Sequence, residues 1–140
     1  MNINEIQDEI IEEFSIFDNK NDSYTYIIEL GKNLPPYPEQ FRLDDKLIKG
    51  CQSKVWVHPY IQNDCVLFYG DSDSTLVKGL VSLVVRVLSN QKAADIVKAD
   101  LYFIDKIGLQ QMLSMNRSNG FAALVKQVKL YALAYQTQGN

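Results

Sequence analysis

The segment at residues 75–88 constrains the fold most strongly, because it predicts a helix that is apolar around most of its circumference. Its polar side chains form a single stripe of residues spaced four apart, Lys78, Ser82 and Arg86. A helix of this kind has to be covered on most sides by other elements. The polar residues 71–74 supply candidate N-caps directly before it. We therefore expect a central, largely buried helix around which the rest of the chain packs.

The residues before this helix predict an antiparallel hairpin. Residues 54–61 are rich in β-branched and aromatic side chains, residues 62–64 are typical of a turn, and residues 65–69 form the returning strand. Pro59 cannot donate a ladder hydrogen bond, so the first strand is expected at a sheet edge or to end near this residue. His58 is expected to pack or to lie on the surface, and we assign it no role.

Helical spacing of apolar residues predicts the flanking elements. The first amphipathic helix carries acidic residues on its outer face and places apolar residues at Ile3, Ile6, Ile10, Phe14 and Phe17. A second helix has candidate N-caps at residues 21–23 and is ended by Pro35 and Pro36. A surface loop at residues 35–45 leads on toward Cys51. Short helices are expected at residues 93–99 and 107–113, and a last helix from residues 114–118 to about residue 136.

The composition is that of an ordinary globular domain. The 140 residues are 46% hydrophobic and 22% charged, and the net charge of −3 offers no basic excess to meet nucleic-acid phosphates. The longest apolar stretch is broken by charges and is too short to span a membrane, and the N-terminus does not resemble a signal peptide. Two cysteines and one histidine are too few for a typical zinc site. We expect one α+β domain over residues 1–140, in which helices cover a small antiparallel sheet, in the reducing cytoplasm.

Cys51 lies in the stretch most typical of thiol chemistry. Gly50 precedes it and loosens the backbone, which is typical of a mobile loop. Lys49 and Lys54 place positive charge near the sulfur and are expected to favour the thiolate. The alternative is that Cys51 packs as a small apolar residue, as most free cysteines do.

The predicted hairpin keeps the two cysteines apart. With a turn centred on Asn63, Cys65 lies opposite residue 61, and Cys51 lies about ten residues up the ladder, or about 30 Å from Cys65. A disulfide needs Cα atoms within about 7 Å, so the two cysteines should not form a redox pair. Cys65 is expected to pack within its strand. The same count places Cys51 opposite about Thr75, at a helix N-terminus, where amide donors stabilise a thiolate while the charges of Asp71 and Asp73 oppose it, so the size of the pKa shift stays open.

Four blocks of the sequence point to one family when they are taken together. They are YIIELG at residues 26–31, KGCQSKVW at 49–56, GDSD at 70–73 with VKGL at 77–80, and RSNG at 117–120. In these blocks the chain resembles the SufE-like sulfur acceptor proteins, which work with cysteine desulfurases. The resemblance spans most of the chain and implies an α+β fold like that of iron–sulfur scaffold proteins.

The resemblance implies that Cys51 carries a persulfide received from a pyridoxal-phosphate-dependent cysteine desulfurase, SufS-like or CsdA-like. It implies that the protein stimulates this enzyme and passes the sulfur to an iron–sulfur scaffold, a SufB-containing complex. Such a protein is a sulfur carrier and desulfurase activator rather than a stand-alone enzyme, with no cofactor or metal of its own, and is a monomer or homodimer. The matching motifs imply partner binding or loop support by Gly50, Gln52, Ser53, Asp73 and Arg117.

Two alternative functions belong to other classes. An iron–sulfur cluster scaffold usually holds its cluster by several thiolates, whereas this chain offers Cys51, Cys65 and His58. A hydrolase with a cysteine nucleophile usually needs a histidine base beside the thiol, and His58 lies about 23 Å from Cys51 along an extended strand. Nucleic acid and membrane are not expected as partners.

Overall fold

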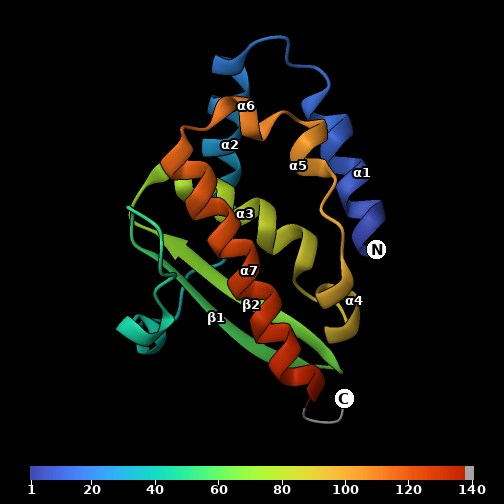
Figure 1. Cartoon of the computed structure of the whole chain (residues 1–140), viewed down its shortest axis with the longest axis vertical. Helices are drawn as coiled ribbons and strands as arrows, with labels where there is room; N and C mark the ends of the chain where they lie inside the picture. Colours follow the sequence, from blue (N-terminus) through green and yellow to red (C-terminus); the bar gives the residue numbers. More distant parts are fainter. Residues whose placement is uncertain (138–140) are drawn as a thin grey trace.

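The computed structural model describes residues 1–137, and a long hairpin crossed by helices dominates its architecture (Figure 1). The elements in chain order are α1 (Ile3–Phe14), α2 (Lys20–Gly31), the 3-10 turns η1 (Glu39–Phe41) and η2 (Asp44–Lys46), β1 (Val55–Gln62), β2 (Cys65–Ser72), α3 (Thr75–Leu88), α4 (Ala93–Lys98), α5 (Phe103–Lys106), α6 (Leu109–Met112) and α7 (Met115–Thr137). The predicted α+β class with an antiparallel sheet is confirmed. Within residues 1–137, no helix combines the length and the apolar character needed to cross a membrane.

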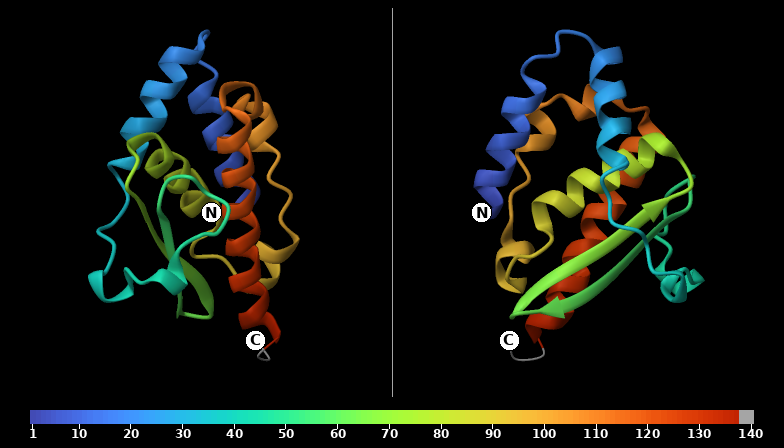
Figure 2. Two further views of the ribbon diagram at one scale, coloured as in Figure 1. Left: turned by 60° about the vertical axis from the view of Figure 1, so that its left-hand side comes forward. Right: turned by 180° about the vertical axis from the view of Figure 1, so that it is seen from behind.

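The central helix α3 has the bounds and the burial that its sequence predicts. It packs against β2 and α2 and also touches α1. Seen from behind, the hairpin lies in front of both α3 and α7 (Figure 2). The polar stripe of α3 ties it to its neighbours: Arg86 pairs with Glu13 and with Glu9 (2.6 Å) of α1, and Lys78 lies 3.6 Å from Asp71 of β2. The polar side of α3 therefore also contacts neighbouring elements, through these ion pairs.

Two glycines bring α2 and α3 unusually close together. A Cβ added to Gly31 would lie 2.8 Å from the backbone nitrogen of Gly79, and one added to Gly79 would overlap the carbonyl of Ile27. The approach is backbone against backbone, so no side-chain rotation can make room. The crossing of α2 and α3 therefore depends on glycine at these positions.

The hairpin is continuous but differs from the prediction by one residue in register. Gln62 pairs with Cys65, and the pairing continues to Val55 opposite Ser72. The turn consists of Asn63 and Asp64 alone, with φ angles of 54° and 64°, which is typical of a tight two-residue turn. The predicted turn at residues 62–64 is therefore one residue too long, because Gln62 belongs to β1.

Pro59 does not interrupt β1. It pairs with Phe68, whose N–H points away from β1 and donates to Ser89 Oγ (2.9 Å), and the pairing continues on both sides of this pair. Because β1 and β2 are the only two strands within the described part of the chain, Pro59 lies on an edge strand, as expected. His58 stacks on Phe41 with ring centroids 3.5 Å apart, and burial lowers the pKa of this histidine. This agrees with a packing role.

Several helix boundaries differ from those that the sequence predicts. Helix α2 begins at Lys20 because the side chain of Asn19 accepts a hydrogen bond from Asp22 N–H (2.8 Å), so the predicted caps at residues 21–23 lie inside the helix. It ends at Gly31, before the prolines. The helix predicted at residues 107–113 is shorter than expected and spans Leu109–Met112, because Gly108 adopts a φ of 77° directly before α6.

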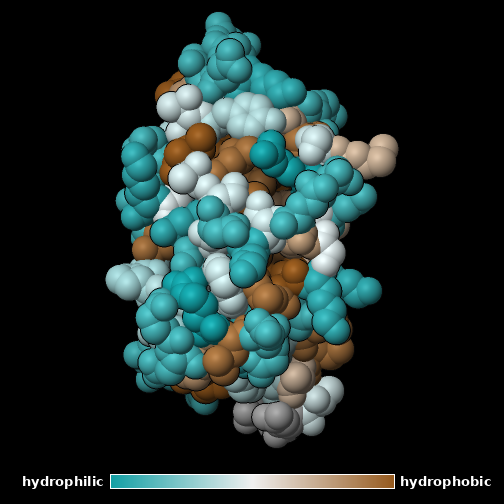
Figure 3. Space-filling model, turned by 90° about the vertical axis from the view of Figure 1, so that its left-hand side faces the viewer, coloured by the Kyte–Doolittle hydropathy of each residue, from teal (hydrophilic) through white to brown (hydrophobic). Residues whose placement is uncertain are grey.

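The surface shows no uniform polarity. On the face seen in Figure 3, hydrophilic residues cover the top end, and hydrophobic residues show in patches between hydrophilic ones over the rest. Large apolar side chains that are more than half exposed include Met1, Ile16, Leu43 and Met115. Met115 is the first residue of α7, the helix that also contributes to the thiol site.

Candidate functional site around Cys51

Cys51 lies in a loop, residues 49–53, whose two ends are fastened to the fold. On one side, Ile48 N–H donates to the carbonyl of Val55 (2.8 Å). On the other, Lys54 N–H donates to the carboxylate of Asp73 (3.0 Å), and Asp73 N–H donates to the carbonyl of Lys54 (3.2 Å). The loop therefore projects from a fixed base at the open end of the hairpin.

The thiol is turned inward from this loop. Gly50 adopts a φ of 94°, which glycine takes up readily and other residues avoid, and this turns the chain toward α7. Cys51 is half-buried, and its Sγ donates a hydrogen bond to the carbonyl of Gly120 in α7 (3.4 Å). A single helix carbonyl thus holds the loop in a closed position.

A pocket of about 80 Å³ lies beside the sulfur. It is lined by Gln52 and Ser53 of the loop, by Val77 and Leu80 of α3, and by Arg117 and Phe121 of α7, among others. Its lining therefore combines apolar side chains of α3 and α7 with polar side chains of the loop and of Arg117. A space of this size holds one or two small atoms or groups and is too small for a typical organic ligand.

The electrostatic surroundings of Cys51 favour the protonated thiol. Burial raises the pKa of the Cys51 thiol above its ordinary value. The carbonyl of Gly120 accepts a hydrogen bond only from the protonated form, which acts in the same direction. The expectation that Lys49 and Lys54 favour the thiolate is wrong for this conformation, because both lysines are exposed and desolvation of the sulfur dominates.

The expected placement of Cys51 opposite Thr75 is also corrected. Strand pairing stops at Val55 and Ser72, and from there the loop turns toward α7. The sulfur therefore meets a carbonyl of α7 rather than the amide donors that begin α3.

The structure gathers the other predicted site residues around this loop. Gln52, Ser53 and Arg117 line the pocket with Cys51, Gly50 makes the turn, and Asp73 fastens the base. Arg117 is exposed, and its backbone N–H donates to Ser114 Oγ (3.3 Å), just before α7 begins. Their roles in partner binding stay predictions. The contact from Gly120 was not foreseen, although this residue lies in the RSNG block at 117–120.

Cys65 lies at the other end of the hairpin. It pairs with Gln62 beside the turn, seven rungs from the Val55–Ser72 pair, or about 23 Å away along the strands. It is half-buried rather than interior, because it borders the turn. Both cysteines are free thiols. Among residues 1–137, no three histidine, cysteine, aspartate or glutamate side chains are grouped so that they could hold a metal ion.

A larger groove of about 550 Å³ runs between α7 and the segment that includes α4 to α6. Leu101 and Ile104 line one side of it and Leu130 and Leu133 of α7 the other, while neither cysteine lines it. The Cys51 thiol therefore faces the small pocket and not this larger groove.

Comparison with known proteins gives one consistent family. The family model described as "SufE: Fe-S metabolism associated domain" matches residues 8–132. An uncharacterized SufE-like protein of Rhizobium meliloti is 39% identical over 127 residues, which are 87% of this chain and 91% of the relative. The cysteine desulfuration protein SufE of Wigglesworthia glossinidia brevipalpis is 36% identical over 121 residues, covering 85% of this chain and 84% of that protein.

A longer relative and a solved structure extend the comparison. The SufE-like protein 1 of Arabidopsis thaliana, chloroplastic/mitochondrial, is 34% identical over 94% of this chain, which spans only 36% of that protein. The solution structure of a hypothetical protein from Thermus thermophilus superposes with a TM-score of 0.78 over 94% of this chain and 96% of the other. At 19% identity, the second similarity shows the shared fold alone.

Proposed function

The chain belongs to the SufE family, and on that premise we propose that Cys51 accepts a sulfur atom from a cysteine desulfurase. Membership supports a role in iron–sulfur metabolism and cysteine desulfuration. The observation that carries the finer assignment is the position of the thiol. Cys51 is free, lies on a loop turned by a glycine, and is held by one carbonyl of α7.

The transfer itself is a thiol–persulfide exchange. The Cys51 thiolate attacks the outer sulfur of the desulfurase persulfide, a new S–S bond forms at Cys51, and the S–S bond on the enzyme breaks. The leaving group is the thiolate of the enzyme's cysteine, which takes up a proton equivalent to the one that Cys51 releases. No electrons are gained or lost overall, so the step needs no oxidant, reductant or cofactor on this chain.

The closed loop sets the order of events. In this conformation the thiol is protonated and bonded to Gly120, and its pKa is raised, so it is a weak nucleophile. Attack requires the loop to leave α7, which breaks one weak sulfur–carbonyl hydrogen bond and re-solvates the sulfur. The exposed Lys49 and Lys54 then favour the thiolate as the sequence predicts. Docking of the desulfurase supplies the free energy for this opening.

The proposed sulfur-acceptor function also implies particular partners. We infer that the desulfurase is a pyridoxal-phosphate enzyme and that Arg117, Gln52 and Ser53, which line the pocket beside Cys51, contact it. Clearing its persulfide raises its turnover, and the sulfur then passes to an iron–sulfur scaffold in the cytoplasm. The alternative of a cluster scaffold is not supported, since the only other thiol, Cys65, lies at the far end of the hairpin.

The decisive experiment replaces the two cysteines separately. Cys51→Ser removes the atom that takes the sulfur and nearly keeps its volume, so stimulation of the cognate desulfurase should fall to background. Mass spectrometry after incubation with desulfurase and cysteine should show no added sulfur. Cys65→Ser is the matched control and should keep both properties. If Cys51→Ser stimulates the enzyme as well as the unaltered protein does, the proposal is wrong.

Arg117→Ala separates docking from chemistry. Interface arginines commonly contribute about 1–2 kcal/mol, so the concentration for half-maximal stimulation should rise by about five- to thirtyfold. The reaction of Cys51 with a small thiol probe should stay unchanged, because Arg117 is exposed and, among the described residues, no hydrogen bond joins its side chain to the loop. A changed probe reaction with unchanged half-maximal concentration would contradict the docking role.

A further inference from the structure

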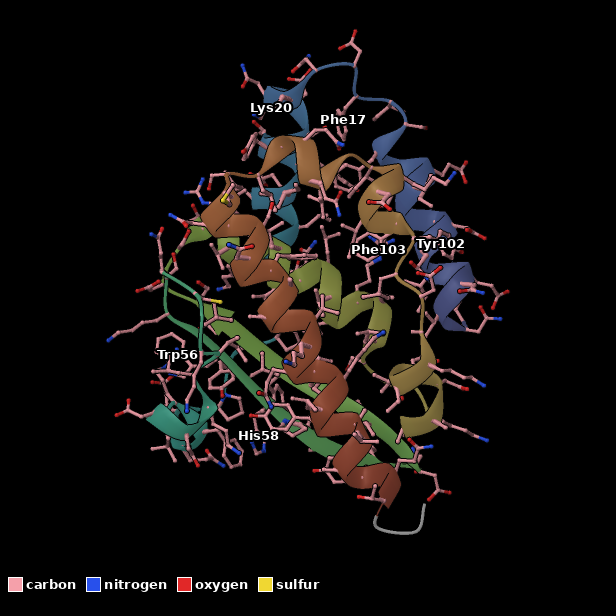
Figure 4. The ribbon with its side chains drawn as sticks, viewed as in Figure 1. Phe17, Lys20, Trp56, His58, Tyr102 and Phe103 are labelled. Atoms are coloured by element: carbon pink, nitrogen blue, oxygen red, sulfur yellow. The ribbon has the colours of Figure 1, made fainter. Side chains whose placement is uncertain are left out.

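A strap, residues 37–48, runs across the outer side of the hairpin and ends at the Cys51 loop. Arg42 lies at its middle. The guanidinium carbon of Arg42 is 4.6 Å from the centroid of the Trp56 ring and 5.2 Å from that of Tyr37. Figure 4 shows Trp56 beside the short turns of this segment. Arg42 therefore joins the strap to β1 by a cation–π contact with Trp56.

The same guanidinium also reaches β2. Arg42 Nη2 lies 2.9 Å from Asp71 Oδ2, and Asp71 is the direct cross-strand partner of Trp56. Arg42 therefore contacts both strands at one cross-strand pair, Trp56 and Asp71. This pair is next to the last pair of the hairpin, Val55 and Ser72, which directly follows the Cys51 loop in β1.

The backbone continues this attachment from Arg42 to the thiol. Leu47 forms an isolated bridge with Trp56, and Ile48 N–H closes the base of the loop on Val55. Three residues later the chain reaches Cys51. The contact of Arg42 with Trp56 and the hydrogen bonds at the base of the loop therefore follow one another along the chain. We expect that loss of the Arg42 contact weakens these hydrogen bonds.

We propose that Arg42 is a positioning residue for Cys51, which fixes the base of the loop so that the thiol returns to the same place against Gly120. This rests on the proposed sulfur-acceptor function of Cys51 and extends it to a residue that does not contact the thiol pocket. The charge of Arg42 is already shared between Asp71 and Glu39 (Nη2 to Oε2, 2.8 Å). It acts within the fold and not as a free cation for a ligand.

Arginine has properties here that lysine lacks. Its guanidinium lies over the Trp56 ring while Nε and Nη2 donate to Glu39, and Nη2 also pairs with Asp71. A lysine keeps one charge near Asp71 but loses the contact of the planar guanidinium with Trp56 and the paired hydrogen bonds to Glu39. Arg42→Lys should therefore retain part of the effect and Arg42→Ala none of it.

Cysteine labelling in the free protein tests the proposal, with Cys65 as the internal reference. Labelling of half-buried Cys51 proceeds through loop opening, so a weaker base should speed it. In Arg42→Ala the ratio of Cys51 to Cys65 alkylation should rise about fivefold, and in Arg42→Lys about twofold, the sizes expected when a cation–π contact and a part-buried ion pair are lost. Fluorescence of Trp56, the one tryptophan of the chain, should change in both variants.

Lys32→Ala is the matched control, because Lys32 is 68% exposed and pairs with neighbouring Glu29 of the same helix end. It should leave the labelling ratio and the fluorescence unchanged. An unchanged ratio in the Arg42 variants, or a rise shared equally by both cysteines, overturns the proposal, since the second result means general destabilisation. Should Arg42→Ala fail to fold, the ratio in Arg42→Lys decides.

A desulfurase assay adds a readout that separates positioning from chemistry. Because docking has to open the loop, Arg42→Ala should lower the concentration for half-maximal stimulation by up to about fivefold and leave the maximal stimulation near that of the unaltered protein, since the sulfur atom itself is unchanged. The labelling test needs no desulfurase. If the Cys51→Ser test refutes sulfur transfer, the labelling result still decides whether Arg42 positions the loop.

Discussion

Gly120 and Cys51 lie so close together that a Cβ at position 120 would be 3.3 Å from Sγ of the cysteine. The same Cβ would lie 3.6 Å and 3.7 Å from the Cα and Cβ atoms of Cys51. The absence of a side chain at Gly120 is thus what allows the loop to close onto α7. The two residues are 69 positions apart in the sequence, so the closed state is a tertiary contact and not a property of the loop alone.

Gly120→Ala should therefore separate fold stability from loop closure. Alanine inside a helix is favoured over glycine by about 0.5–1 kcal/mol, so the melting temperature should stay the same or rise. The added methyl group crowds the sulfur, and we expect the loop to yield because it lies outside the helices and strands, whereas Gly120 is held within α7. We expect Cys51 to react about two- to fivefold faster with a thiol probe, for a contact penalty of about 0.5–1 kcal/mol. Cys65, measured in the same samples, should not change, and equal rates at Cys51 before and after the substitution would contradict this.

The reactivity of Cys51 should also depend on pH in a particular way. Burial raises the pKa of its thiol, so closure is stabilised fully below the thiol's ordinary pKa, about 8.5, and this stabilisation is lost as the pH rises through the higher value of the folded state. Alkylation rates measured against pH should have their midpoint above that of the same cysteine in the urea-unfolded chain. A midpoint equal to the unfolded value, or lower, would be the contrary result.

Gly79→Ala tests the close crossing of α2 and α3. Its Cβ would overlap the carbonyl of Ile27, and a Cβ at Gly31 of the same crossing would lie only 2.8 Å from the Gly79 nitrogen. We expect a loss of about 3 kcal/mol or more in the free energy of unfolding, at the high end for overpacking. Urea denaturation followed by circular dichroism measures it. Gly108→Ala serves for comparison: its strain comes from a φ of 77° and not from a clash, so it should cost less, about 1–2 kcal/mol.

Arg86→Met tests the attachment of α3 to α1. The Arg86 guanidinium holds the pKa of Glu13 below its ordinary value, mainly by a hydrogen bond. The stabilisation is therefore present above the ordinary pKa of a glutamate and is lost as the pH falls through the lower value of the folded state. The variant should unfold about 1–2 kcal/mol more easily at pH 7, with a smaller difference at pH 3. Lys98→Met, whose pair with Asp95 is exposed, should change stability little at either pH. A difference that does not shrink at low pH would exclude the ion pair as its cause.

Patterns that depend on neighbouring residues predicted much of the fold. Helix α3 has the predicted bounds, because its apolar residues leave only the stripe at Lys78, Ser82 and Arg86. The hairpin was recognisable from its β-branched and aromatic residues. The register was wrong by one residue because Gln62 fits a turn as well as a strand, and only the φ angles of Asn63 and Asp64 distinguish the two.

The site was predictable in its members and not in its electrostatics. Cys51 with Gln52, Ser53 and Arg117 could be grouped from the motifs, and the structure brings these residues to one pocket. The protonation of the thiol could not be predicted, since Lys49 and Lys54 are visible in the sequence while the contact with Gly120 is not. Asn19 was overlooked as the cap of α2 for a similar reason. Residues 21–23 offer equally good capping side chains, and only the extended backbone of Asn19 identifies it as the cap.

The inward turn of Cys51 has a consequence for the survival of the protein under oxidative stress. Hydrogen peroxide oxidises thiolates far faster than thiols, and the first product is a sulfenic acid. A half-buried sulfur with a raised pKa, bonded to the carbonyl of Gly120, offers little thiolate to such an oxidant. In the sulfur-acceptor function that we propose, the closure that delays sulfur uptake until a partner arrives would therefore also slow the oxidation of Cys51 between encounters.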